Sequence, residues 1–147
     1  MWQRIQTLYL VISAILLCFL LFGSAVSVNT ADGIEYIRYT SLVKPYMAIL
    51  LWILAAIQVL ALISFKVRIL QMRLSTLGAL VSLGLFIWLG VLYFKAPEQV
   101  VFRWTAIFPF AISAFDLLAA RGAFQDQLVV ESASRLRDDR RRKGRKA

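Results

Sequence analysis

The chain contains no histidine and only one cysteine, Cys18, among its 147 residues. Without histidine, it cannot build a histidine-ligated zinc site, a Ser-His-Asp triad or a histidine proton shuttle. A single cysteine cannot form an internal disulfide or a dithiol redox pair. Cys18 lies in an apolar run, where a thiol packs as a small hydrophobic side chain. These absences exclude several classes of enzyme and of zinc protein.

Common phosphate-binding and nucleophile motifs are missing as well. The sequence has no Walker-type phosphate loop, no paired-cysteine metal motif and no nucleophile elbow. Acidic residues are scarce, with 8 against 17 basic ones, which gives a net charge of +9. We therefore predict a protein that is not an enzyme and that binds no cofactor and no metal.

Hydrophobic residues are abundant, at 61% of the chain, and they cluster in four blocks. A transmembrane helix needs about 20 mainly apolar residues. The predicted spans are about 5–28, 46–65, 74–94 and 104–120, and the fourth is the weakest because it contains Pro109 and Asp116. The predicted fold is an all-α membrane protein, with a four-helix transmembrane domain over residues 1–120 and a cytoplasmic tail over residues 121–147.

The first block has a second interpretation, as a signal peptide. Small residues, "SAVS", follow Gly23 and could form a cleavage site. However, only one basic residue, Arg4, precedes the apolar core. We favour a first helix that is retained.

The basic residues predict the orientation, because loops rich in Lys and Arg stay in the cytoplasm. Thirteen of the 17 basic residues lie before the first span, between the second and third spans, or after the fourth. The two intervening loops hold the other four. We therefore expect a multi-pass inner-membrane protein whose N- and C-termini are both cytoplasmic.

Two loops on the opposite side allow two interpretations. Residues 34–43, "IEYIRYTSLV", are rich in β-branched residues and tyrosine, which is typical of a short strand. Residues 99–104, "QVVFRW", could pair with that strand. The alternative is two irregular loops, and the sequence does not decide between them.

One side of the third span carries small residues at helical spacing: Ser75, Gly78, Ala79 and Ser82. Small residues allow helix backbones to approach closely within a membrane. We expect this side of the helix to pack inside the bundle.

Asp116 is an ionisable residue within a span, and such residues are functional candidates by default. It precedes Arg121 by five residues, or about 7.5 Å along a helix, which predicts a position near the cytoplasmic end. Arg121 diverges from it around the helix, so we predict a structural ion pair between Asp116 and Arg4. A role in proton or cation coupling and a carboxylate without a dedicated partner are the alternatives.

Gln58 is the other polar residue deep within a span. It lies eight residues before Lys66, or about 12 Å from the cytoplasmic end. We predict that it makes an interhelical hydrogen bond to Ser82, with a role in substrate binding as the alternative.

The tail predicts a short amphipathic helix followed by a strongly basic segment. Such a segment either binds anionic lipid headgroups or a partner, or it remains a solvated tail. No aromatic residue follows Phe124 to stack on bases, which argues against nucleic acid. The predicted contact residues for lipid or a partner are Arg140, Arg141, Arg142, Lys143, Arg145 and Lys146.

Three stretches together carry a family resemblance: "QRIQTLYL" at 3–10, "FKVRILQMRLSTL" at 65–77 and "LLAARGAFQDQLVVESASRLR" at 117–137. In order and spacing they resemble a family of small four-span inner-membrane proteins widespread in Bacteroidota and classed as a domain of unknown function. The resemblance implies a retained first helix and supplies no activity.

Two functions fit these observations. The first is a non-enzymatic scaffold or accessory subunit, with a membrane protein or a second copy of the chain as partner. The second is a small oligomeric transporter that uses Asp116 and Gln58.

Overall fold

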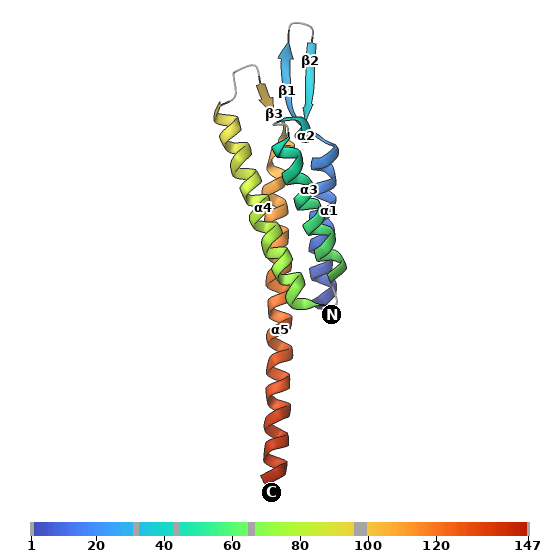
Figure 1. Cartoon of the computed structure of the whole chain (residues 1–147), viewed down its shortest axis with the longest axis vertical. Coiled ribbons are helices and arrows are strands. Elements are labelled where there is room, and N and C mark those ends of the chain that lie inside the picture. Colours follow the sequence, from blue (N-terminus) through green and yellow to red (C-terminus); the bar gives the residue numbers. More distant parts are fainter. Residues whose placement is uncertain (1, 31–32, 43–44, 65–66, 96–99, 147) are drawn as a thin grey trace.

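Four long helices form an elongated bundle in a computed structural model that describes residues 2–30, 33–42, 45–64, 67–95 and 100–146 (Figure 1). The helices are α1 (Trp2–Phe22), α3 (Tyr46–Ile63), α4 (Arg68–Lys95) and α5 (Phe108–Lys146). Each contains an apolar segment long enough to cross a membrane. The predicted four-helix architecture is therefore confirmed.

A small sheet caps the bundle at the end opposite the N-terminus (Figure 1). It contains β1 (Ser24–Thr30), β2 (Gly33–Arg38) and β3 (Val100–Phe102), in the antiparallel order β2-β1-β3. Of the two interpretations of the loops, the strand interpretation holds for residues 34–38 and 100–102, whereas residues 39–42 form a helix, and the pairing that it suggested between the two segments is wrong. The third strand pairs with β1 and not with β2, because β1 continues directly from the first helix and occupies the centre of the sheet.

The first helix is shorter than the predicted span, which ran to residue 28. It ends at Phe22, and the following residues form β1. At Gly23 a Cβ atom would lie 2.3 Å from the carbonyl oxygen of Phe19, so only glycine fits this close turn. The segment "SAVSVNT" then extends as a strand, as its alternating Val residues favour.

Two short elements connect the sheet to the bundle. They are α2 (Tyr39–Leu42) and the 3-10 helix η2 (Trp104–Ile107). The hydroxyl of Tyr39, a fully buried residue, is 2.9 Å from Oγ1 of Thr105, which donates to the carbonyl oxygen of Ser24 at 3.1 Å. These bonds link the hairpin to the start of α5. Burial raises the pKa of Tyr39, which keeps its phenol neutral.

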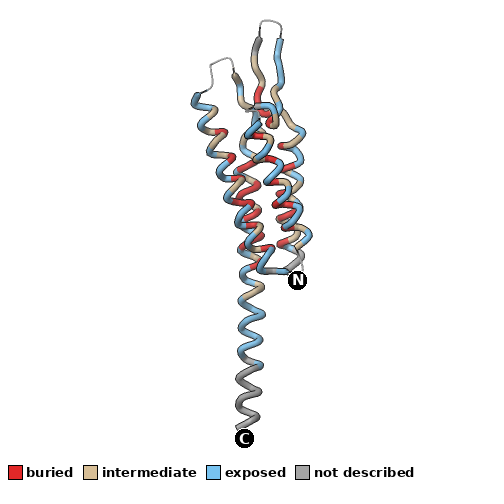
Figure 2. Tube along the Cα trace, in the orientation of Figure 1, coloured by how far each residue is buried: buried red, intermediate tan, exposed pale blue. Residues whose placement is uncertain are grey.

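The half of the bundle nearest the sheet has a core of large aliphatic side chains. In Figure 2 the buried positions run along the inner faces of the four helices and reach the base of the sheet. The outer faces are apolar but exposed, as expected of helices that face lipid. The large core side chains include Leu17, Leu20, Leu51, Leu54, Leu85, Leu89 and Ile112.

The fourth long helix differs from its predicted span, which ended near residue 120. It continues without a break from Phe108 to Lys146, and its distal half extends beyond the other helices (Figure 1). The predicted tail is therefore the continuation of α5 and not a separate short helix. The small-residue side of α4 is buried, and α4 packs most extensively against α5, as we expected.

Candidate functional site

Polar side chains are buried on all four long helices, mainly in the half of the bundle away from the sheet. A buried polar group needs a hydrogen-bond partner, so such a concentration marks a candidate site. The buried polar residues are Gln6, Ser13, Gln58, Gln71, Ser75, Ser82, Ser113 and Asp116.

Asp116 is the centre of this group and joins three helices. Its Oδ1 atom accepts a hydrogen bond from Oγ of Ser13 on α1, at 2.7 Å, and one from Nε2 of Gln58 on α3, at 3.0 Å. The Gln58 amide also contacts Oγ of Ser13 and, at 3.5 Å, the carbonyl oxygen of Leu10. The side chain of Asp116 is fully buried. We call Asp116, Ser13 and Gln58 the carboxylate cluster.

Helix α4 meets the carboxylate at a glycine, which has no side chain. A Cβ atom at Gly78 of α4 would lie 2.9 Å from Oδ2 of Asp116 and 3.5 Å from Cγ2 of Ile57. A carbon that close to an oxygen is a steric overlap. Gly78 therefore makes the room in which the carboxylate lies against α4.

The cluster lies near the middle of the bundle and not at its end. Ser13 is eight residues after Ile5 and nine before Phe22, which is about 12 Å and 13 Å along α1. The expected position near the cytoplasmic end was based on a count from Arg121. That count treated Arg121 as the helix boundary, whereas α5 continues far beyond it.

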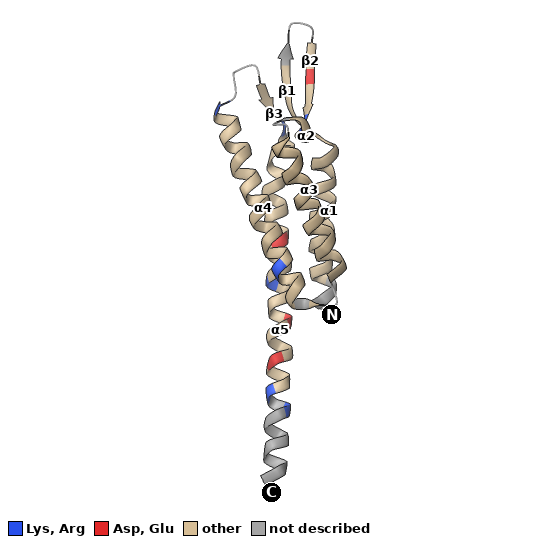
Figure 3. Cartoon of the chain, viewed as in Figure 1, with Lys and Arg blue, Asp and Glu red and all other residues tan. Residues whose placement is uncertain are grey.

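No basic side chain among the described residues pairs with Asp116, and the one salt bridge found there joins Arg135 to Glu131. In Figure 3, charged residues are concentrated along α5 and at helix ends. The predicted partner, Arg4, has a side chain outside the described residues, so the ion pair stays a prediction. Position 4 precedes Ser13 by nine residues, or about 13 Å along α1.

Gln58 makes interhelical hydrogen bonds, as predicted, but Ser82, the suggested partner, is wrong. Oγ of Ser82 donates to the carbonyl oxygen of Ala79 at 3.1 Å, and Oγ of Ser113 donates to the same oxygen at 3.0 Å. Ser82 is one helical turn beyond Gly78, towards the sheet, and its own helix supplies its acceptor. Gln58 instead bonds to Asp116 and Ser13, which lie level with it.

Sequence reasoning missed Ser13, although a signal was present. Ser13 is the only hydroxyl residue in the apolar run from Leu10 to Phe22. Nothing in the linear sequence indicated that this hydroxyl would face Asp116, because that contact joins positions 103 residues apart.

Several atoms of the buried polar group lack a hydrogen-bond partner in the described structure. They include Oδ2 of Asp116, Oε1 of Gln58 and Oγ of Ser75. The first two are acceptors, which can receive a hydrogen bond or contact a cation. The cluster can therefore connect three helices while Oδ2 of Asp116, which lies close to Gly78 of α4, has no donor among the described residues.

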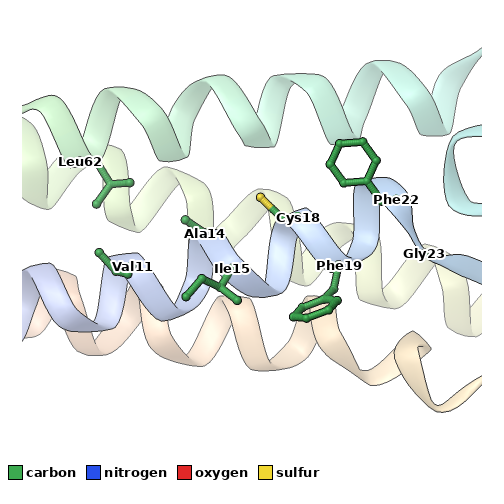
Figure 4. A pocket seen from close by; sticks show the side chains of 8 residues that line it. All are labelled: Val11, Ala14, Ile15, Cys18, Phe19, Phe22, Gly23 and Leu62. Atoms are coloured by element: carbon green, nitrogen blue, oxygen red, sulfur yellow. The ribbon is translucent and has the colours of Figure 1, made fainter.

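An apolar groove of about 550 Å³ runs along α1 and is lined by Val11, Ala14, Ile15, Cys18, Phe19, Phe22, Gly23 and Leu62 (Figure 4). No charged residue is among the described residues that line this groove. Within the described ranges, no three His, Cys, Asp or Glu residues lie close enough to hold a metal ion.

The predicted basic contact residues 140–146 have side chains outside the described set, and their role stays a prediction.

The bundle and its buried cluster place the chain in the class of helical proteins with four apolar helices long enough to cross a membrane. The profile of the family described as Domain of unknown function (DUF4293) matches residues 2–136. The chain belongs to this family. Searches of curated proteins and of solved structures give no match.

Proposed function

We propose that this is a multi-pass inner-membrane protein with both termini in the cytoplasm, and that it acts as a non-enzymatic scaffold or accessory subunit. In this proposal the distal part of α5, residues 125–146, contacts anionic lipid or a partner protein. We call this segment the α5 arm. The observation that carries the proposal is the unbroken continuation of α5 beyond the rest of the bundle.

The arm begins just beyond a close contact between α1 and α5. Gln6 of α1 packs against Gly122, and beyond this level the described side chains of α5 are mostly exposed. Most helical stability in proteins comes from packing against other elements, which the exposed side chains of the arm lack. The arm also exposes Leu128, Val129 and Val130, by 49%, 67% and 52%. A partner or surface that covers these residues would supply the missing packing.

The orientation rests on charge and on the fold. The N-terminus lies at the end of the bundle from which the arm extends, opposite the sheet (Figure 1). In the sequence, 13 of the 17 basic residues precede the first span, separate the second span from the third, or follow the fourth, and four lie in the two other loops. The positive-inside rule then favours a cytoplasmic arm and a sheet on the other side of the membrane.

A pull-down of the full-length protein in mild detergent tests the scaffold role, with co-purifying proteins measured by mass spectrometry. We expect a partner at fixed stoichiometry that is lost with Val129→Glu and retained with the matched control Ser134→Glu. Both changes add one negative charge to the arm, but only the first removes an exposed apolar side chain. A partner set unaffected by Val129→Glu and by deletion of residues 125–147 would contradict the proposal.

A transporter is the second candidate, and the position of Asp116 near mid-height favours it. A coupling carboxylate is expected near the middle of a membrane, and Oδ2 of this one has no hydrogen-bond partner in the part of the chain that the structure describes. Flux of ions or cationic drugs into liposomes, with the Asp116→Asn variant as comparison, tests this function. Flux by the native protein that the variant lacks would support transport over a purely structural role.

A further inference from the structure

A polar cavity lies between α1 and α5, at the end of the bundle opposite the sheet. Its volume is about 210 Å³. It is separate from the carboxylate cluster, none of whose residues lines it. The lining residues are Ile5, Gln6, Tyr9, Leu118, Arg121, Gly122 and Gln125.

Gln6 presents an unsatisfied donor at this cavity. Its side chain is 3% exposed, and Nε2 has no acceptor in the described structure. A Cβ atom at Gly122 would lie 2.7 Å from Cγ of Gln6 and 3.4 Å from its Nε2. The amide therefore lies across Gly122, in space that only glycine leaves open. A buried amide without an acceptor costs about 1–3 kcal/mol, which favours a ligand that accepts its hydrogen bond.

The charge of the lining points to an anion. Arg121 is exposed and has no salt bridge among the described residues, and Gln125 lies one helical turn after it on the same side of α5. No carboxylate is among the described residues that line the cavity. The polar lining thus offers several N–H donors and a positive charge with no competing acidic group, which is the chemistry that binds phosphate.

Two other lining residues, Leu118 and Tyr9, lie on the side of the cavity nearer the middle of the bundle, whereas Ile5 precedes Gln6 on α1 and lies on the outer side. Leu118 is one turn before Arg121 on α5, and the ring of Tyr9 stacks with that of Phe115 at 6.2 Å. The charged and apolar parts are therefore ordered along the bundle axis. A membrane phospholipid has the same order, with a phosphate at the surface and acyl chains towards the middle.

We propose that this cavity binds the phosphate of an anionic phospholipid, held by Arg121 and by Nε2 of Gln6, with an acyl chain along Leu118 and Tyr9. A volume of about 210 Å³ fits the headgroup region and not the whole lipid, whose chains would lie on the exposed apolar surface. The proposal rests on the membrane placement proposed above but is independent of the scaffold role.

Native mass spectrometry of the full-length protein in mild detergent tests the site with three probes: phosphatidylglycerol, diacylglycerol and inorganic phosphate. We expect one phosphatidylglycerol to remain bound and diacylglycerol, which lacks a phosphate, to dissociate. Arg121→Ala should weaken phosphatidylglycerol binding about tenfold or more, as expected for a lost charge-assisted bond. Arg73→Ala is the matched control, because Arg73 is an exposed basic residue of α4 outside the cavity, and it should leave binding unchanged.

A second variant tests the site without removing a charge. Gly122→Ala displaces the Gln6 amide, and we expect weaker phosphatidylglycerol binding with the positive charge intact. If Arg73→Ala weakened phosphatidylglycerol binding as much as Arg121→Ala, the proposed site would be wrong, because the lipid would then be attracted to basic residues in general. If diacylglycerol or inorganic phosphate bound as tightly as phosphatidylglycerol, the ligand would not be a phospholipid. Extraction of the native protein from membranes by alkaline carbonate would instead contradict the membrane placement itself.

Discussion

At the scale of single residues, the bundle combines one buried carboxylate with neutral partners and a glycine. Ser13 and Gln58 both donate to Oδ1 of Asp116, and Gly78 leaves room for Oδ2. A buried carboxylate without donors would be strongly unfavourable, so these partners stabilise its position. The cluster therefore sets the register of α1, α3 and α5 against one another.

Gly78 provides a direct test of this packing. Gly78→Ala places a methyl group 2.9 Å from Oδ2 of Asp116, and we expect a loss of about 1–3 kcal/mol from overpacking. Gly84→Ala on the same helix is the control, because nothing lies within 4 Å of its Cβ position. There the better helix propensity of Ala should leave the stability unchanged or raise it by up to about 1 kcal/mol. Thermal unfolding in detergent measures both, and equal effects at the two glycines would contradict the close approach at Gly78.

A double-mutant cycle measures the bond between Asp116 and Gln58. Asp116→Leu leaves the Gln58 amide without its carboxylate acceptor, and Gln58→Leu removes one donor to Oδ1. We expect both single variants to be less stable and the double variant to lose less than their sum. The coupling should be of order 0.6 kcal/mol, the average for polar pairs between membrane helices. The same cycle between Ser82 and Gln58 should give no coupling, since Ser82 bonds within its own helix.

At the scale of elements, the hairpin is connected to the bundle through Tyr39 and Thr105. Tyr39 is fully buried, and its hydroxyl contacts Thr105 at the start of the fourth span. Arg103 adds a second connection, since it donates to Oγ of Ser24 at 2.8 Å and lies over the ring of Tyr36 at 5.3 Å. These contacts hold the sheet in one orientation on the end of the bundle.

The buried phenol predicts a dependence of stability on pH. Burial raises the pKa of Tyr39 in the folded protein above that of the unfolded chain, which is about 10. The stabilisation is complete below pH 10 and is lost as the pH rises through the folded pKa, because the unfolded chain loses its proton first. Tyr39→Phe should cost about 1 kcal/mol near pH 7 through the lost hydrogen bond. Between pH 9 and 11, unfolding curves should show native stability falling more steeply than that of the variant, and parallel curves would contradict the assignment.

At the scale of the whole molecule, the two ends of the bundle differ in character. One end has the sheet and a leucine-rich core, and the other has buried polar residues, the polar cavity and the α5 arm. Both termini belong to the second end (Figure 1). In a membrane this arrangement would give each side a different surface, which is compatible with the accessory role proposed above.

Labelling of single cysteines in intact cells tests this orientation. In a Cys18→Ser background, Glu35→Cys places a thiol on β2, and Ser132→Cys places one on the arm, and both positions are exposed. We expect an impermeant reagent to label position 35 and not position 132. Permeabilised cells should show labelling at both positions, which controls for reactivity. Labelling at 132 but not at 35 in intact cells would invert the proposed topology.

The sequence by itself determined the four helices, because long apolar runs have few other stable arrangements in water or lipid. It allowed the outer strands β2 and β3 as one of two interpretations, but it missed β1, whose first residues it placed in the first span. It also indicated the packing side of α4, through the spacing of Ser75, Gly78 and Ala79. These features are local and periodic, so neighbouring residues carry the signal.

Only the tertiary structure decided which distant residues meet. The partners of Asp116 come from α1 and α3, 103 and 58 positions away, and the third strand joins β1 and not β2. The position of Asp116 along the bundle depended on how far α5 continues, which no local pattern near Arg121 revealed. Contacts of this kind depend on how helices and strands align in space, and in a single sequence nothing links residues so far apart.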